Sequence, residues 1–238
     1  MSQATYLNQI LKDGFAIIQD VISDNTISEI LMALEKVQLG NATKIRKGRV
    51  YAIRNLLQEV PSLKTLNQHS KFRALMEPIL GQEAKVVRAI FFDKTPEANW
   101  KVTWHQDVTI AVQKSDDIEG FGPWSEKAGI MHVQAPASIL ENILTLRVHL
   151  DDSTVENGAL AVIPGSHCWG RLNFTQIQAL RDEIPAVLCQ VPKGSVMIMR
   201  PLLLHASSAS ANPSHRRVLH FEYSASQLPG KLKWLDEK

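Results

Sequence analysis

The feature that most constrains the fold of this 238-residue chain is a change in its pattern near residue 84. Before that point apolar residues recur at helical spacing, as in Ile27, Ile30 and Leu34, and Gly14 and Gly81 follow the expected helix ends. After it come short stretches rich in β-branched and aromatic residues, separated by turn residues. A helical start followed by roughly six to eight short strands predicts a mainly β protein with α: a double-stranded β-helix, or jelly roll, with N-terminal helices packed on one outer face.

The same patterns predict the individual elements. Helices are expected at 5–13, from Ser23 or Asp24 to Gly40, at 62–68, 70–80 and 175–183. Strands are expected at 15–18, 84–92, 100–110, 143–150, 159–163, 186–191, 195–199 and 216–223. Residues 41–50 are polar and basic and predict a loop, and residues 111–138 lack a clear period and predict a long loop. We expect one domain over 1–238, with a helical N-terminal portion of about 1–80.

Composition narrows the class of protein. A net charge of +2 gives no case for a nucleic-acid surface, and 45% hydrophobic residues suffice for a core. Cys168 and Cys189 form no C-x-x-C pair, so neither a disulfide framework nor a thiolate zinc site is expected. No signal-peptide pattern and no apolar run of about 20 residues is present, so a cytoplasmic protein without membrane contact is expected. The oligomeric state stays open.

A His-x-Asp pair suggests a metal site. If residues 100–110 form one strand, His105 and Asp107 leave the same face of the sheet. His205 follows an apolar stretch and precedes a small, polar loop, which is a reasonable position for a third ligand. Together they would form the two-histidine, one-carboxylate set that leaves open positions on non-haem Fe(II). A core histidine bonded to a backbone carbonyl is the alternative for His205.

Three arginines follow strand patterns. Arg216 lies eleven residues after His205, and a guanidinium inside a barrel requires an anionic partner. The adjacent Arg217 should point the other way, and the pattern does not separate the two. Arg147 shares a strand face with Thr145 and His149. We expect this face to point inward, with an outward, solvated Arg147 as the alternative.

The order and spacing of these motifs resemble the phytanoyl-CoA dioxygenase family of Fe(II)/2-oxoglutarate oxygenases over about residues 10–224. The matching stretches are Trp104-His105-Gln106-Asp107, Asn157-Gly158-Ala159-Leu160, Ile163-Pro164-Gly165-Ser166-His167, His205 and Arg216-Arg217.

The resemblance implies that His105, Asp107 and His205 are iron ligands and catalytic residues, with 2-oxoglutarate and O2 as cosubstrates. It places the far carboxylate of 2-oxoglutarate on Arg216 and Ser207. It also implies structural turns at Asn157-Gly158 and at Pro164-Gly165-Ser166, and a loop-orienting role for His167. Because related halogenases replace the carboxylate ligand with a small residue, Asp107 argues against halogenation. Arg147, with Thr145 beside it, is expected to contact 2-oxoglutarate or an anionic substrate.

The expected reaction is hydroxylation of a small molecule with release of succinate and CO2; desaturation, ring formation and epimerisation stay open. The alternatives are a non-catalytic metal-binding jelly-roll protein and a zinc hydrolase that uses the same three ligands. Residues 108–133 are expected to form a lid over the site. The candidates for substrate contact are Trp104, Phe121, Trp124 and His132, with core packing as the alternative.

Overall fold

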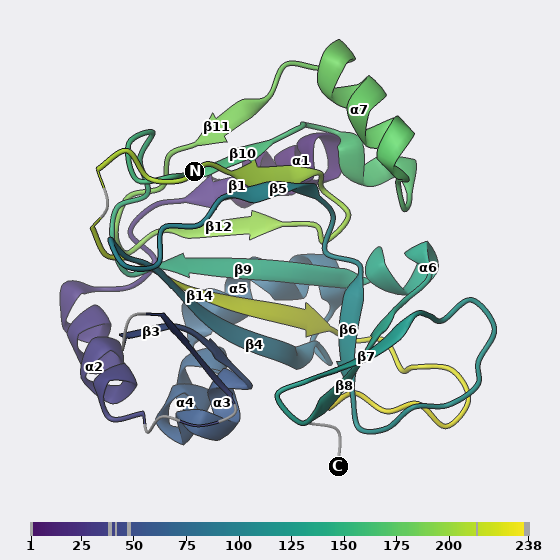
Figure 1. Cartoon of the computed structure of the whole chain (residues 1–238), viewed down its shortest axis with the longest axis horizontal. Helices are drawn as coiled ribbons and strands as arrows, with labels where there is room; N and C mark the ends of the chain where they lie inside the picture. The colour runs from purple at the N-terminus through teal and green to yellow at the C-terminus, as the bar shows by residue number, and fades with distance from the viewer. Residues whose placement is uncertain (1, 38–39, 41, 47–48, 213, 236–238) are drawn as a thin grey trace.

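Three antiparallel sheets form the framework of the computed structural model, which describes residues 2–37, 40, 42–46, 49–212 and 214–235 (Figure 1). The largest sheet has the strand order β1 (Phe15–Ile18), β12 (Val196–Met199), β9 (Ile143–His149), β14 (Arg216–Ser224), β4 (Lys85–Lys94), β3 (Arg49–Arg54) and β2 (Thr43–Arg46). The second has the order β11 (Val187–Cys189), β10 (Leu160–Val162), β13 (His205–Ser207) and β5 (Val102–His105). The third has the order β6 (Thr109–Val112), β8 (Ile130–Gln134) and β7 (Trp124–Lys127).

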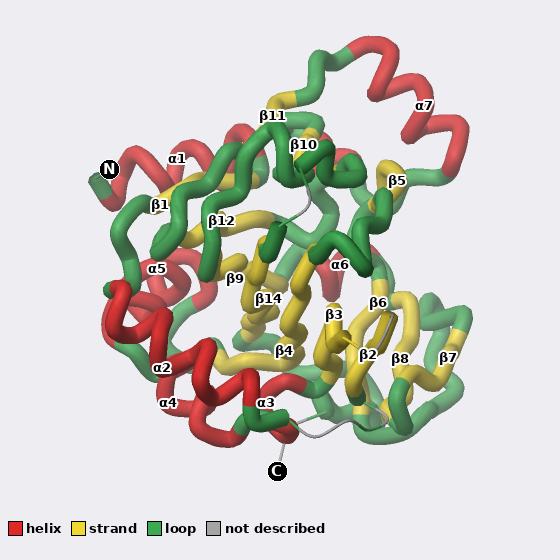
Figure 2. The backbone as a smooth tube through the Cα atoms, turned by 60° about the vertical axis from the view of Figure 1, so that its left-hand side comes forward, coloured by secondary structure: helices red, strands yellow, loops and turns green. Residues whose placement is uncertain are grey.

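The N-terminal helices cover the outer face of the seven-stranded sheet, which confirms the predicted arrangement (Figures 1 and 2). Phe72 of α5, for example, packs against Phe221 of β14 with ring centroids 6.4 Å apart. Ser23 caps α2 and Gly14 ends α1 with a φ of +83°, as the sequence predicts. The helices are α1 (Gln3–Asp13), α2 (Asp24–Glu35), α3 (Leu56–Glu59), α4 (Lys64–Asn67), α5 (Ser70–Leu80), α6 (Ala137–Leu140) and α7 (Phe174–Glu183), with 3-10 turns at Pro61–Leu63 and Ser166–Trp169. Within the described residues, no helix combines the length and the apolar character needed to cross a membrane.

The inner face of the seven-stranded sheet is unusually polar for a buried surface. Along β9, Leu144, Leu146 and Val148 join the apolar core beneath the helices, whereas Arg147 and its neighbours Thr145 and His149 point the other way and are buried. The register of β14 and β4 places further polar side chains on the same inner face. These buried side chains are Lys94, Arg216, His220 and Glu222. The four-stranded sheet faces them, since its Leu160 and Val162 pack on Met197 and Met199 of β12.

Three expectations from the sequence are wrong. The expected loop at 111–138 contains β7, β8 and α6, and β6 lies at its start. The expected loop at 41–50 is a hairpin of β2 and β3 wherever it is described, and residues 41, 47 and 48 lie outside the described residues. The strand expected over 100–110 is two strands in different sheets. β2 and β7 are polar edge strands, held by pairing with one neighbour, so hydrophobic periodicity gives them little signal.

Candidate metal centre

The turn after β5 positions the first two candidate ligands. His105 is the last residue of β5, and Asp107 lies beyond the strand, not within it as the sequence suggested. Gln106 fixes the turn: its Nε2 donates to the carbonyls of Gly170 (2.8 Å) and Leu202 (2.7 Å), and its Oε1 accepts from the Leu172 amide (2.8 Å). Because both ends of this buried amide are satisfied, the turn has a defined conformation and both ligands converge.

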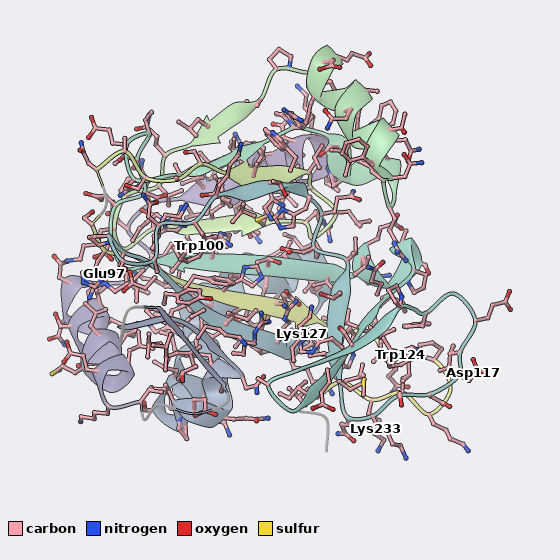
Figure 3. All side chains as sticks on the ribbon, in the orientation of Figure 1. Glu97, Trp100, Asp117, Trp124, Lys127 and Lys233 are labelled. Atoms are coloured by element: carbon pink, nitrogen blue, oxygen red, sulfur yellow. The ribbon has the colours of Figure 1, made fainter. Side chains whose placement is uncertain are left out.

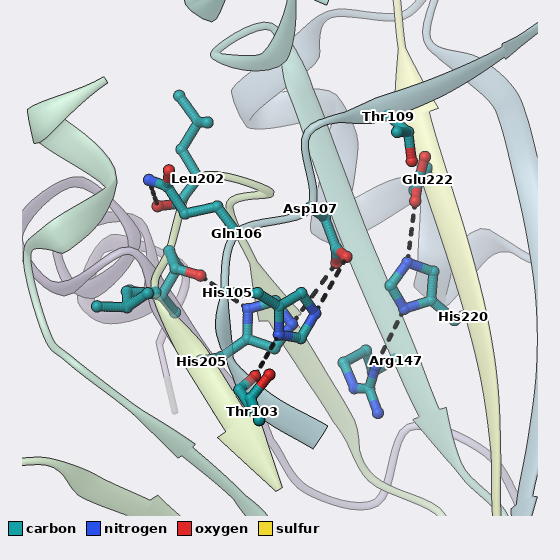
Figure 4. A network of polar contacts seen from close by, with 12 residues as sticks. Thr103, His105, Gln106, Asp107, Thr109, Arg147, Leu202, His205, His220 and Glu222 are labelled. Atoms are coloured by element: carbon teal, nitrogen blue, oxygen red, sulfur yellow. Dashed lines mark hydrogen bonds and ion pairs between the residues drawn. The ribbon is translucent and has the colours of Figure 1, made fainter. Parts of the chain in front are cut away.

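His205 completes a compact group of three ligands (Figure 4). It is the first residue of β13 and lies opposite His105 in the register of the two strands. Each histidine Nε2 is 3.7 Å from one oxygen of Asp107, Oδ1 for His105 and Oδ2 for His205. Two ligand atoms about 2.1 Å from the same ion lie at most about 4.2 Å apart, so both separations fit a single ion. Among the described residues, this is the His/Cys/Asp/Glu group with metal-ligand spacing.

Backbone carbonyls set the tautomers of both histidines. Nδ1 of His105 lies 2.8 Å from the Thr103 carbonyl, and Nδ1 of His205 lies 2.8 Å from the Leu203 carbonyl. Each Nδ1–H therefore donates to a carbonyl and leaves the Nε2 lone pair for a metal. His205 makes the carbonyl bond expected of a core histidine and still presents Nε2 to Asp107.

The charge states of Asp107 and His205 suit a divalent cation. For His105, burial lowers the pKa but the neighbouring Asp107 raises it overall, an effect that a bound cation would oppose. Burial alone would raise the pKa of Asp107, but His205, His105 and His220 hold it well below its usual range. Burial lowers the pKa of His205 to about 4. At neutral pH the site therefore holds an ionised carboxylate and a neutral imidazole, which is the form that binds metal.

A buried cationic pocket lies next to this group, and the sequence did not single out one of its members, Lys94. The Lys94 ammonium donates to Ser207 Oγ (2.8 Å) and to the Ser208 carbonyl (2.6 Å), and Ser207 Oγ donates to the Gly158 carbonyl (2.7 Å). The Arg216 guanidinium donates to the same Gly158 carbonyl. The signal available in the sequence was alternation, because Lys94 continues the inward-facing series Ile90 and Phe92 along β4.

The charges of this pocket call for an anionic partner. Nε of Arg216, Nε of Arg147 and both ring nitrogens of His149 are buried without a hydrogen-bond partner in the described chain. Burial, followed by the charges of Arg216 and Arg147, lowers the pKa of Lys94 to about 7. Burial likewise lowers the pKa values of Arg147 and Arg216 to about 10. Buried cations in excess are costly unless a counter-charge binds, so the pocket fits a small dianion.

Close backbone approach shapes the floor of the pocket. Gly158 has a φ of +79°, and a Cβ at this position would lie 2.6 Å from the Ser208 carbonyl oxygen and 2.9 Å from the Lys94 ammonium. A turn is expected at Asn157-Gly158. The structure adds that a side chain at position 158 would block the contact of Lys94 with Ser207 and Ser208, so glycine is required there.

The structure separates the two adjacent arginines that the sequence could not. Arg216 is 5% exposed and faces the pocket. Arg217 faces the other way and binds Asp151 through two hydrogen bonds, Nε to Oδ2 (2.8 Å) and Nη2 to Oδ1 (2.7 Å). Arg216 is therefore available for a ligand, whereas Arg217 already has a carboxylate partner. Thr145 is buried on the inner face but pairs with Glu222, on the far side of Arg147 from Arg216.

The candidates for substrate contact divide into two groups. Trp104 alternates with His105 and packs on the outer side of the four-stranded sheet, where Arg181 lies 5.7 Å from its ring centroid. Phe121 and Trp124 pack with the cluster around Trp234, and Trp124 lies beside the C-terminal segment in Figure 3. All three pack against apolar neighbours, and Trp104 also lines a cavity beside α7, so their contact with substrate stays a prediction. His132 is buried on the opposite face of the small sheet, paired with Ala111.

His167 lies away from the three ligands. It contacts Gly14, where a Cβ would come within 2.5 Å of its Nδ1, and it lines a cavity with Ile10, Arg200 and Leu202. This placement packs the 164–168 turn against the end of α1, as expected for a loop-orienting side chain.

The sequence is similar to those of known dioxygenase-related proteins. The chain is 24% identical over 197 residues to a phytanoyl-CoA dioxygenase domain-containing protein 1 homolog of Caenorhabditis briggsae, covering 74% of this chain and 60% of that protein. It is 23% identical over 246 residues to a probable alpha-ketoglutarate-dependent hypophosphite dioxygenase of Stutzerimonas stutzeri, covering 91% of this chain and 77% of that protein. The chain thus spans about three fifths of the length of its nematode relative.

Solved structures share the fold. AviO1 from Streptomyces viridochromogenes Tue57 superposes with a TM-score of 0.70 at 20% identity, over 96% of this chain and 97% of its own. EctD from S. alaskensis, solved with 2-oxoglutarate and 5-hydroxyectoine, superposes with a TM-score of 0.72 at 18% identity, over 94% of this chain and 76% of its own. The sequence model of phytanoyl-CoA dioxygenase (PhyH) matches residues 10–218. With most of its length matched by that model, the chain belongs to the phytanoyl-CoA dioxygenase family.

Proposed function

We propose that this chain is an Fe(II)- and 2-oxoglutarate-dependent dioxygenase that oxidises a small molecule, with hydroxylation as the default outcome and succinate and CO2 as coproducts. The observation that carries the proposal is the juxtaposition of the His105, Asp107 and His205 ligand group with a buried cationic pocket whose arginine Nε atoms have no partner in the described chain. The S. stutzeri relative, named as alpha-ketoglutarate-dependent, and EctD, solved with 2-oxoglutarate, support it, because both refer to the same cosubstrate.

Each side chain has a part in this proposal. His105, Asp107 and His205 would hold Fe(II), which supplies the binding and activation of O2 beside the cosubstrate. Arg216 and Ser207 would bind the far carboxylate of 2-oxoglutarate, with Lys94 as an added charge. Arg147 Nη1 donates to Nδ1 of His220 (3.0 Å). This bond holds the guanidinium on the inner face, beside the cationic pocket. The apolar side chains of Met197, Met199 and Val218 keep water from the inner face.

The test is succinate formation from 2-oxoglutarate under Fe(II) and O2, with a metabolite screen to find the substrate. We expect slow, substrate-independent turnover and faster turnover with a substrate, and we expect Zn(II) to inhibit both. Metal binding without any oxygen or 2-oxoglutarate consumption would instead favour the non-catalytic protein. Hydrolysis supported by Zn(II) would favour the zinc hydrolase.

Because Lys94 titrates near neutral pH, we expect the KM for 2-oxoglutarate to depend on pH. In the pocket without an anion its pKa is about 7, so the ammonium loses its proton as the pH rises above 7. A bound dianion favours the protonated form, so binding above pH 7 must take up a proton and weakens as the pH rises, by up to about tenfold per pH unit. The KM for 2-oxoglutarate should therefore increase between pH 7 and 9, whereas Lys94→Met should have a higher KM at pH 7 and a flatter profile. An equal slope in both proteins would exclude Lys94 as the titrating group.

A further inference from the structure

A second group of basic side chains lies where the seven-stranded sheet meets the small three-stranded sheet. We call Arg54, Arg88, Lys127 and His132 the mouth cluster. We propose that the mouth cluster binds an oxyanion group of the primary substrate, such as a phosphate, sulfonate or carboxylate, while the carbon to be oxidised lies at the metal centre. The inference rests on the proposed function and names the substrate class of that same site.

The strand registers bring the four side chains together from two sheets. Arg88 of β4 lies opposite Glu222 of β14, and Arg54 of β3 lies opposite Ile90, so both arginines point to the inner face. In the small sheet, His132 pairs with Ser125 of β7, and Lys127 lies two residues further along the same face. Figure 3 shows Lys127 nearer the centre of the molecule than Trp124, which lies at the other end of β7. A small cavity between the sheets is lined by Arg54, Arg88 and His132.

A chain of hydrogen bonds runs from the mouth cluster along the inner face, and Figure 4 shows its part from Glu222 through His220 to Arg147. Arg88 Nη1 donates to the carbonyl of Thr109 (3.0 Å), which is two residues after Asp107, and to Glu222 Oε1 (3.1 Å). The same Glu222 oxygen accepts from His220 Nε2 (3.1 Å), whose other ring nitrogen accepts from Arg147.

The chain distance from Asp107 into β6 limits the size of the substrate. Thr109 and Ala111 lie two and four residues beyond Asp107, which in an extended chain corresponds to about 7 and 13 Å. Ala111 pairs with His132. A substrate that reaches both sites would therefore hold its anionic group at most roughly 13 Å from the metal-binding end of this segment.

Among the described residues, the mouth cluster sets three cationic side chains, Arg54, Arg88 and Lys127, against one carboxylate, Glu222. Glu222 is its carboxylate neighbour, and Arg88 already shares that group with His220. Nε of Arg54 is buried without a partner in the described chain. Burial, reinforced by Arg88, lowers the pKa of Arg54, and burial with Arg88 and Arg54 lowers the pKa of Lys127. Like charges held together in a partly buried site are unfavourable until an anion binds, which is typical of ligand sites.

Of the four mouth-cluster residues, only Arg88 has contacts that a purely structural role would explain. Arg88 of β4 links two other strands: it donates to the Thr109 carbonyl of β6 and to Glu222 of β14. That role does not account for Arg54 or Lys127, for which the described chain shows no ion pair. His132 donates from Nδ1 to the Ile130 carbonyl (3.0 Å). Burial, with the charges of Arg88, Lys127 and Arg54, lowers its pKa to about 4, so it lines the site as a neutral side chain and the three cations carry the charge.

The first experiment measures binding of inorganic phosphate, sulfate and acetate by calorimetry. The protein is loaded with Mn(II) and saturating 2-oxoglutarate, so that the Arg216 pocket is filled and cannot bind the probe. We expect saturable binding, weakened about tenfold in Arg54→Gln and in Lys127→Gln, because each removes a charge-assisted contact, with partial recovery in Arg54→Lys. Lys85→Gln, an exposed lysine on β4, is the matched control and should bind as the unmodified protein does. No saturable binding, or equal binding by all variants, would overturn the inference.

The second experiment compares phosphorylated, sulfonated and carboxylated small molecules with their neutral parents in the succinate assay. We expect the anionic members alone to accelerate turnover, and this acceleration to be lost in Arg54→Gln and Lys127→Gln; the group that accelerates most identifies the oxyanion. Equal acceleration by neutral parents would refute the mouth cluster as a specificity site while leaving the dioxygenase proposal standing. Conversely, probe binding without any succinate would refute the dioxygenase proposal alone.

Discussion

Replacing Asp107 by alanine should abolish succinate formation and weaken divalent-metal binding by more than about 100-fold, since even partners that only orient metal ligands are worth about 10–100-fold. Asp107 is the member of the ligand group that contacts both histidines, at 3.7 Å from each Nε2. Its removal takes away the negative charge that balances the cation and leaves only the two imidazoles as ligands. Metal affinity is measured by equilibrium dialysis with Mn(II), and turnover by succinate release under Fe(II).

The matched control is Asp117→Ala, an exposed carboxylate in the segment between β6 and β7. It should leave both metal affinity and turnover unchanged. Turnover of Asp107→Ala at the unmodified rate would show that the carboxylate is not an iron ligand and would remove the basis of the proposed function.

The sequence predicted the parts of this molecule that follow strict alternation. The apolar residues of β9 alternate with Thr145, Arg147 and His149, and the structure places the first set under the helices and the second inside. The order of motifs along the chain was enough to suggest that His105, Asp107 and His205 meet, although β5 ends before Asp107. Periodicity and order are local or one-dimensional properties, so they can be obtained from the sequence.

What could not be predicted depends on contacts between distant segments. Trp104 was a candidate for substrate contact because it lies next to His105, but strand alternation sends it to the opposite face of its sheet. The mouth cluster was not predicted as a whole, because Arg54, Arg88, Lys127 and His132 come from four strands in two sheets. β7, which carries Lys127, is a polar edge strand with no periodic signal of its own.

The choice between Arg216 and Arg217 leads to the second large effect that we expect. Arg216→Leu should raise the KM for 2-oxoglutarate about 10–100-fold, which corresponds to the loss of a charge-assisted hydrogen-bond pair of roughly 1.5–3 kcal/mol. Arg217→Leu is the matched control: it breaks the partly exposed pair with Asp151 and should lower the free energy of unfolding by about 1 kcal/mol without a comparable change in KM. Initial rates at varied 2-oxoglutarate and urea unfolding separate the two effects.

A pH profile distinguishes loss of a ligand contact from general damage to the pocket. The charge of Arg216 contributes to the lowered pKa of Lys94, so Arg216→Leu should raise that pKa and let Lys94 stay protonated to higher pH. The rise of KM with pH should therefore begin at a higher pH in Arg216→Leu than in the unmodified protein, even though KM at pH 7 is larger. A pocket that had merely lost its structure would show the larger KM without this displacement. If Arg217→Leu, and not Arg216→Leu, raised KM and displaced the profile, the assignment of the inner face of β14 to the cosubstrate would be wrong.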